Sequence, residues 1–121
     1  MENYNDKIII LMRKIGINPA HRGYDYIKEA VAIVLANSNA IYGLTKFMYQ
    51  DIAKMYNATP SRVERCIRHA IEHPITEMKN NDKMAIFGVQ ANNHDFHITN
   101  KAFISTMVRV IRDEPNNPIW S

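Results

Sequence analysis

The sequence feature that most constrains the fold is the tetrad Asn57-Ala58-Thr59-Pro60, which separates two helical stretches. After glycine, asparagine is the residue that best tolerates a left-handed backbone, so Asn57 suits a tight turn. Thr59 offers a side-chain oxygen as an N-cap, and Pro60 follows at the first helical position, where its missing N–H costs nothing. The tetrad predicts a short helix, a tight turn and a second helix within residues 50–72.

The two predicted helices carry the small and apolar residues that a crossing pair requires. Ala53 stands where the second helix would cross the first, and its small side chain lets the two backbones approach closely. Six further residues are spaced to face a core: Ile52, Tyr56, Ala58, Val63, Cys66 and Ile67. Together these features are typical of a helix-turn-helix, which inserts its second helix into the major groove of duplex DNA.

The outer face of the second helix is the candidate DNA-contacting surface. At about 100° per residue, a broad face is shared by Ser61, Arg62, Arg65, Arg68 and His69. An arginine can donate two hydrogen bonds to guanine O6 and N7, and Glu64 can accept one from cytosine N4. The alternative is an ordinary solvated helix, with weak ion pairs from Glu64 to Arg68 and from Arg68 to Glu72. The turn before the helix favours the DNA-contacting interpretation.

A second set of residues is predicted to contact the DNA backbone, where contacts position the protein without selecting a sequence. This set is Lys46, Lys54, Thr59 and Ser61.

Length and composition are consistent with one soluble domain. The 121 residues are 46% hydrophobic, which suffices for a single core but not for two domains of ordinary size. The net charge of +3 permits nucleic-acid binding without requiring it. One cysteine excludes an intramolecular disulfide and favours a reducing cytoplasm. The apolar run from Ile8 to Met12 is too short for a signal peptide or a membrane span, so we expect no membrane association.

Apolar residues at spacings of three and four predict a compact all-α bundle of about six helices. The expected helices cover residues 1–15, 24–36, 45–56, 60–73 and 81–87, and a last one is expected to be capped by Thr99 or Asn100. We expect Thr45 to cap the third helix, Pro74 to end the fourth at or before His73, and residues 89–97 to form a loop.

We therefore expect one helical domain over residues 1–114, with the helix-turn-helix at about 48–73. Residues 115–121, which include two prolines, are expected to form a mobile tail. Trp120 in this tail is a candidate for docking on the domain or on a partner.

The second helix also resembles a known family. The run Ser61–Glu72 closely resembles the recognition helix in the C-terminal DNA-binding effector domain of the stage-zero sporulation response regulator. Further matches are Ile15-Gly16, Pro19-Ala20-His21, Gly23-Tyr24, Tyr26, Glu29-Ala30, Thr45-Lys46, Tyr49, Asp51-Ile52-Ala53-Lys54, Phe87-Gly88, Thr99-Asn100 and Phe103-Ile104. The resemblance runs in register over nearly the whole chain.

The resemblance implies a six-helix effector domain that binds a short promoter box and regulates transcription, with its last helix helping tandem copies to pair. The matched positions imply a groove-facing set of Arg62, Glu64, Arg65, Arg68 and His69, with Ser61 and nearby amides on phosphate. The family also uses a helical segment after the recognition helix to contact the sigma subunit of RNA polymerase. This chain has His73-Pro74-Ile75-Thr76-Glu77-Met78-Lys79 there.

The family's effector domain follows a phosphorylatable receiver domain, which this sequence lacks, so the chain is expected to be an excised fragment or a freestanding relative. A competing hypothesis is a receiver-less interaction protein that pairs with a full-length regulator through Lys101 to Arg112 and modulates it.

Catalytic and metal-binding functions are not expected. Cys66, His69 and His73 share one helix, but Cys66 is a core position of the motif, and His94 and His97 are expected to be solvated loop residues. No nucleophile and base stand out as a pair, and four glycines form no phosphate-binding loop. We therefore expect no enzyme activity, cofactor, metal or small-molecule substrate.

Overall fold

The computed structural model describes residues 4–43 and 47–121, with the side chains of residues 41–43 excepted. In these ranges the chain forms six α-helices and no strand. The helices are α1 (Tyr4–Ile15), α2 (Arg22–Ala36), α3 (Tyr49–Met55), α4 (Pro60–Glu77), α5 (Asn80–Phe87) and α6 (Asn100–Asp113). Short 3-10 turns span Ser38–Gly43, Val89–Asn92 and Pro118–Trp120. The predicted all-α bundle is confirmed.

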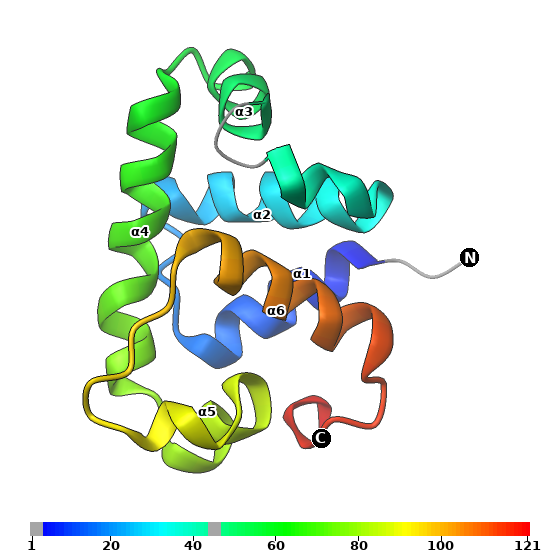
Figure 1. Cartoon of the computed structure of the whole chain (residues 1–121), viewed down its shortest axis with the longest axis vertical. Helices are drawn as coiled ribbons and strands as arrows, with labels where there is room; N and C mark the ends of the chain where they lie inside the picture. The colour runs from blue at the N-terminus through cyan, green and yellow to red at the C-terminus, as the bar shows by residue number, and fades with distance from the viewer. Residues whose placement is uncertain (1–3, 44–46) are drawn as a thin grey trace.

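The long helix α4 forms one side of the bundle, and the other helices are arranged along it (Figure 1). Near its N-terminal end lies α3, and near its C-terminal end lies α5. Between these ends, α2 and α6 pack against α4, with α1 packed on both α2 and α6. This arrangement leaves the opposite side of α4 at the edge of the molecule.

The apolar stripes predicted from the sequence form the core. The buried residues of α1 are Ile8, Leu11, Met12 and Ile15, and those of α6 include Phe103, Ile104, Met107, Val108 and Ile111. In α2, Ile27, Ala30, Val31 and Val34 are buried, whereas Leu35 is only partly buried. One continuous cluster results, because helices from the whole length of the chain contribute to it.

Local capping chemistry fixes the helix ends. Gly16 has a φ of +93°, the left-handed conformation that glycine adopts freely, and it ends α1. The Oγ1 atom of Thr99 accepts a hydrogen bond from the backbone N–H of Ala102, so of the two predicted caps, Thr99 and Asn100, Thr99 is the one that caps α6. α5 stops at Gly88 as expected.

The expectation that Pro74 ends the fourth helix is wrong, because α4 continues to Glu77. A proline within a helix removes one backbone hydrogen bond and disturbs the turn before it, but packing on the following turn can offset that cost. Ile75 supplies such packing, with only 5% of its surface exposed. The hydroxyl of Thr76 also donates to the carbonyl oxygen of Glu72 at 3.0 Å.

The beginning of the third helix also differs from the prediction. α3 starts at Tyr49, preceded by one wider helical turn at residues 47–48. Thr45, the predicted cap, lies outside the described residues. The predicted loop at residues 89–97 includes the 3-10 turn Val89–Asn92.

The C-terminal segment, which was expected to be a mobile tail, packs against the domain in the structure. Ile119 is 2% exposed, and the indole N–H of Trp120 donates to the carbonyl oxygen of Glu114 at 3.0 Å. The side chain of Asn117 donates to the carbonyl oxygen of Ala85 in α5 at 2.8 Å. The C-terminal segment is therefore docked on the domain, as proposed for Trp120.

Candidate nucleic-acid interface

The turn between α3 and α4 has the geometry that its sequence predicts. Asn57 has a φ of 54°, and it is the only non-glycine residue with a positive φ among those described. The N–H of Tyr56 donates to the carbonyl oxygen of Ile52. The N–H of Ala58 donates to the carbonyl oxygen of Ala53, five residues earlier, at 2.8 Å. This six-to-one hydrogen bond beside a left-handed residue ends α3 and redirects the chain into α4.

The start of α4 is also as predicted. The Oγ1 atom of Thr59 accepts a hydrogen bond from the N–H of Arg62 at 3.2 Å, and Pro60 occupies the first helical position. These two residues fix the N-terminus of the helix that is predicted to meet DNA.

The crossing of the two helices is closely packed. Ala53 is 3% exposed, and Ile52, Val63 and Ile67 are completely buried. The other three predicted anchors, Tyr56, Ala58 and Cys66, are partly buried. The helix-turn-helix is therefore packed into the core of the domain.

Tyr56 attaches the end of α3 to α2. Its hydroxyl donates to Oε1 of Glu29 at 3.2 Å, and its ring packs edge-on against Tyr26 with centroids 5.3 Å apart. Burial, with a contribution from the Glu29 carboxylate, raises the pKa of the Tyr56 phenol. The phenol therefore stays neutral and remains a donor at physiological pH.

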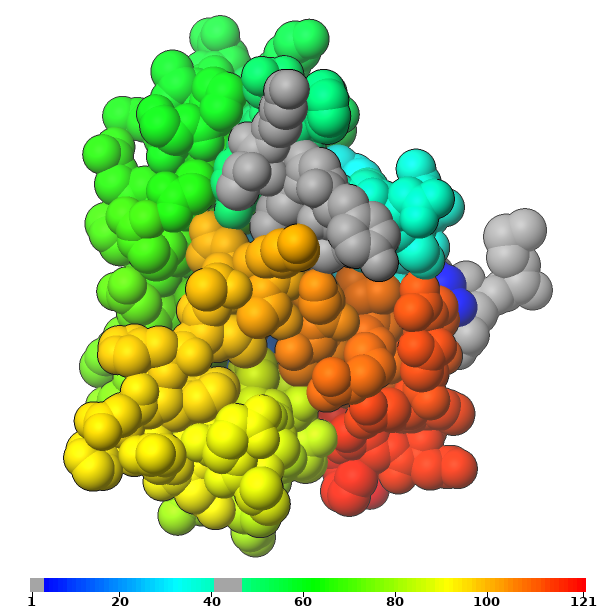
Figure 2. Space-filling model, in the orientation of Figure 1, coloured from blue at the N-terminus to red at the C-terminus, as the bar shows by residue number. Residues whose placement is uncertain are grey.

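Three of the predicted base-contacting residues lie together on one exposed side of α4. Arg62, Arg65 and His69 are all exposed, and their spacing of three and four residues places them on adjacent turns of one face. We call this set the reading surface. The N-terminal half of α4 forms an edge of the molecule in Figure 2.

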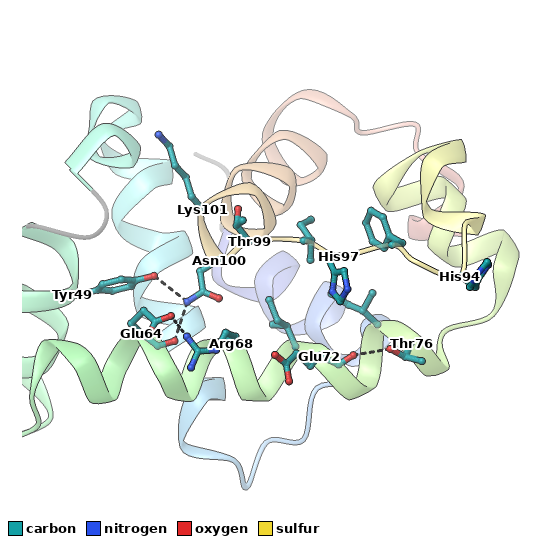
Figure 3. A pocket seen from close by; sticks show the side chains of 14 residues that line it. Tyr49, Glu64, Arg68, Glu72, Thr76, His94, His97, Thr99, Asn100 and Lys101 are labelled. Atoms are coloured by element: carbon teal, nitrogen blue, oxygen red, sulfur yellow. Dashed lines mark hydrogen bonds and ion pairs between the residues drawn. The ribbon is translucent and has the colours of Figure 1, made fainter.

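Glu64 and Arg68 occupy a different part of the helix. Their side chains form an ion pair one turn apart, with 34% and 45% of their surfaces exposed. Both line a cavity on the flank of α4 that faces the start of α6, together with Tyr49 and Asn100 (Figure 3). The structure thus divides the five predicted residues into an outward set of three and a flanking pair.

The predicted phosphate-contacting residues lie around the turn. Lys54 is exposed near the end of α3, and Thr59 and Ser61 are exposed at the start of α4, with their hydroxyl oxygens 3.4 Å apart. The first-turn N–H groups and the helix dipole also favour an anion at this end of α4. The fourth residue of the set, Lys46, lies outside the described residues.

Two residues that the sequence analysis did not place in the site are brought to it by the fold. The side-chain amide of Asn100 donates to the hydroxyl of Tyr49 at 3.0 Å and to the carbonyl oxygen of Glu64 at 2.9 Å. Tyr49 and Asn100 both stand at positions that match the sporulation regulator family. This match was the signal in the sequence that could have identified them.

Within residues 4–43 and 47–121, no group of three or more His, Cys, Asp or Glu side chains is arranged to hold a metal ion. None of the helices in the same ranges has the length and apolar character needed to cross a membrane.

Comparison with known protein families agrees with this geometry. Residues 8–111 match the family described as the C-terminal domain of the sporulation initiation factor Spo0A. The matched region includes α2 to α5 completely and most of α1 and α6. This family is a DNA-binding regulatory domain that binds duplex DNA, and it is not an enzyme family. The chain therefore belongs to the Spo0A C-terminal domain family and is a DNA-binding regulator.

Proposed function

We propose that the protein regulates transcription by binding a specific duplex sequence, with α4 inserted in the major groove. The observation that carries this proposal is the reading surface, in which Arg62, Arg65 and His69 lie exposed on one face of a capped helix. The packed turn fixes the angle between α3 and α4, so that α3 lies across the DNA backbone when α4 enters the groove.

Within this arrangement, Arg62 and Arg65 are the residues that contact guanine, because each is exposed and can donate two hydrogen bonds to O6 and N7. His69 lies one turn further along and contacts the adjacent base or phosphate. Arg68 reaches the DNA from the flank, and Glu64 orients it through their ion pair. Glu64 can still accept from cytosine N4 with the carboxylate oxygen that Arg68 does not use.

Backbone phosphates are bound around the turn. Lys54 and Ser61 contact phosphates on the α3 side, supported by the N-terminal dipole of α4. Thr59 can bind a phosphate through its hydroxyl hydrogen, because the capping bond from Arg62 uses Oγ1 only as an acceptor. Lys46 belongs to the same proposal on its sequence position alone.

The decisive experiment has two steps. The preferred site is first selected from a random pool of duplexes, and dissociation constants are then measured on this site and on a scrambled duplex. Arg65→Ala should weaken binding to the preferred site by about 1–3 kcal/mol and affect the scrambled duplex much less. Lys54→Ala should weaken binding to both duplexes alike and lower the salt dependence by about one unit of slope.

Arg13→Ala is the matched control, because Arg13 is an exposed arginine of α1 outside the helix-turn-helix. It removes the same charge, and we expect it to leave the preference for the selected site unchanged. Equal losses on both duplexes for Arg65→Ala would reject the base-contacting role.

Tandem pairing on DNA, or pairing with a full-length regulator, is a secondary proposal. The apolar stripe of α6 packs inside the domain, so pairing would use its exposed side, which includes Lys101, Ser105 and Arg109. Sedimentation with duplexes that carry one or two sites tests the tandem form. Co-elution of the chain with a full-length regulator in the absence of DNA tests the interaction-protein hypothesis.

Contact with the sigma subunit is a further secondary proposal. Because α4 continues to Glu77, the chain retains a helical segment after the reading surface, with His73, Thr76 and Glu77 exposed. Binding of the purified sigma subunit to wild-type protein, compared with a variant carrying alanine at these three positions, tests it.

A further inference from the structure

Asn100 is a buried polar residue at the junction of three helices. Among the side chains that the structure describes, it is the one amide or charged group that is buried, with 9% of its surface exposed. It occupies the first turn of α6. Burial of an amide is unfavourable unless hydrogen bonds within the protein replace those to water. The position of Asn100 therefore calls for a physical explanation.

Its two amide hydrogens bind both helices of the helix-turn-helix. Nδ2 donates to the hydroxyl of Tyr49 in α3 at 3.0 Å and to the carbonyl oxygen of Glu64 in α4 at 2.9 Å. Figure 3 shows these two hydrogen bonds diverging from the start of α6. One side chain thus connects α3 and α4 to the last helix.

Stability alone does not account for this asparagine. Its Oδ1 atom is buried and has no hydrogen-bond partner. A buried hydrogen-bonded pair can often be replaced as a whole by apolar residues of similar shape at little cost, or with a gain. Hydrogen bonds differ from apolar contacts in being directional, so the pair of bonds defines an orientation that a leucine would not.

The packing around Asn100 increases the importance of these bonds. A cavity of about 750 Å³ separates α4 from the segment that leads into α6 (Figure 3). Its apolar wall includes Ile71 and Ile75 from α4 and Phe96 and Ile98 from the segment. Beside this cavity, the hydrogen bonds of Asn100 connect the start of α6 directly to α3 and to the N-terminal half of α4.

The same hydrogen bonds act on a residue beside the reading surface. The carbonyl oxygen of Glu64 binds Asn100, while the carboxylate of Glu64 forms the ion pair with Arg68. A rotation of α4 that breaks the bond to Asn100 therefore moves Arg68 and, on the same rigid helix, Arg65. Bidentate contact with a guanine depends on the placement of the arginine.

We propose that Asn100 is a positioning residue for base recognition, which fixes the orientation of α4 relative to α3 through Tyr49 and the Glu64 carbonyl. This proposal rests on the proposed insertion of α4 into the major groove. It assigns sequence discrimination, and not general affinity for DNA, to a residue that does not touch DNA.

The test compares discrimination with stability. The ratio of dissociation constants on the scrambled and selected duplexes is measured for each variant, together with its Tm. Asn100→Leu should lower the Tm, because it leaves the buried Tyr49 hydroxyl without its donor, and it should keep similar binding to the scrambled duplex while the ratio falls about tenfold. Tyr49→Phe keeps the shape of the core and removes one acceptor, so its ratio should fall about threefold.

Asn117→Ala is the matched control. The amide of Asn117 also donates two hydrogen bonds, to the carbonyl oxygen of Ala85 and to Oε1 of Glu114, both at 2.8 Å. The bond to Ala85 fastens the C-terminal segment to α5, at the other end of the domain from α3 (Figure 1). We expect Asn117→Ala to lower the Tm and leave the discrimination ratio unchanged.

The outcomes separate the two proposals. A wild-type ratio in Asn100→Leu and Tyr49→Phe, with a reduced ratio in Arg65→Ala, would overturn the positioning role and leave the proposed function intact. A wild-type ratio in Arg65→Ala would overturn both proposals. A reduced ratio in Asn117→Ala would show that the ratio follows stability alone, which also overturns the positioning role. If Asn100→Leu does not fold, Tyr49→Phe decides.

Discussion

The backbone of Gly23, in the first turn of α2, lies directly against the backbone of Cys66 in the middle of α4. A Cβ atom added at Gly23 would overlap the carbonyl oxygen of Cys66 and lie 2.7 Å from the Cβ of Ala70. This close approach packs the start of α2 directly against α4, the helix that carries the reading surface. It explains a glycine at a helical position where its conformational freedom is a disadvantage.

Gly23→Ala should therefore destabilise the domain by about 1–3 kcal/mol, because the added methyl group forces α2 and α4 apart. Helix propensity alone predicts the opposite sign, since alanine is favoured over glycine by about 1 kcal/mol. Urea unfolding followed by circular dichroism measures the difference.

Gly16 provides the comparison for this prediction. An added Cβ there meets only the Cβ of Pro74 at 4.0 Å, so the cost of substitution comes from its φ of +93°. Gly16→Asn should recover most of the stability that Gly16→Ala loses, whereas Gly23→Asn should be no better than Gly23→Ala. A Gly23→Ala variant as stable as the wild type would contradict the close approach.

The turn at Asn57 gives a second prediction. Asn57→Ala should cost about 1–2 kcal/mol in the free energy of unfolding, because alanine does not readily adopt a φ of 54°. Asn57→Gly should stay within about 0.5 kcal/mol of the wild type, since glycine adopts this conformation without strain. Thermal and urea unfolding of the three proteins test this order, and equal stabilities for alanine and asparagine would argue against it.

Asn57 also shows which parts of the structure the sequence could predict. Its left-handed turn and the caps at Thr59 and Thr99 depend on chemistry within a few residues, so all three were predicted correctly. The same holds for the exposure of Arg62 and Arg65, which follows from helical periodicity. These local features define the helix-turn-helix and its outer face.

Features that depend on distant residues were not predictable in this way. α4 continues past Pro74 because Ile75 is buried by other helices. The C-terminal segment packs on the domain because Asn117 and Trp120 donate hydrogen bonds to backbone carbonyl oxygens. The flanking position of Arg68 depends likewise on the fold, since Tyr49 and Asn100 come from other helices. Helical periodicity gives the exposure of a residue but not its neighbours.

The proline inside α4 leads to a third prediction. Pro74→Ala should stabilise the domain by about 1 kcal/mol, because it restores a backbone N–H that can donate within the helix. The gain is smaller than the full cost of an interior proline, about 3 kcal/mol, because the ring is partly buried and proline also restricts the unfolded chain. Thermal unfolding measures the change.

Pro60→Ala is the matched control for Pro74→Ala. Pro60 occupies the first helical position, where no backbone donor is lost, so its replacement should be neutral or slightly destabilising. A Pro74→Ala variant that is less stable than Pro60→Ala would show that packing of the Pro74 ring outweighs the missing hydrogen bond.

Glu114 gives a prediction about pH, because it anchors the C-terminal segment through its carboxylate. Oε1 accepts from the amide of Asn117 and Oε2 from Nε of Arg109, each at 2.8 Å. The hydrogen bond from Asn117, with that from Arg109, lowers the pKa of Glu114 below its ordinary value of 4.5. The folded state therefore binds this proton less readily than the unfolded state does.

The stabilisation from the Glu114 carboxylate is fully present above pH 4.5 and is lost as the pH falls through the lower pKa of the folded protein. Glu114→Gln should thus be less stable than the wild type at neutral pH, with a difference that shrinks in acid. Urea unfolding between about pH 7 and about pH 3 measures both proteins. Glu77→Gln, at the exposed end of α4, controls for the loss of one carboxylate. A difference between Glu114→Gln and wild type that stays constant over this range would show that the charge on Glu114 does not hold the segment.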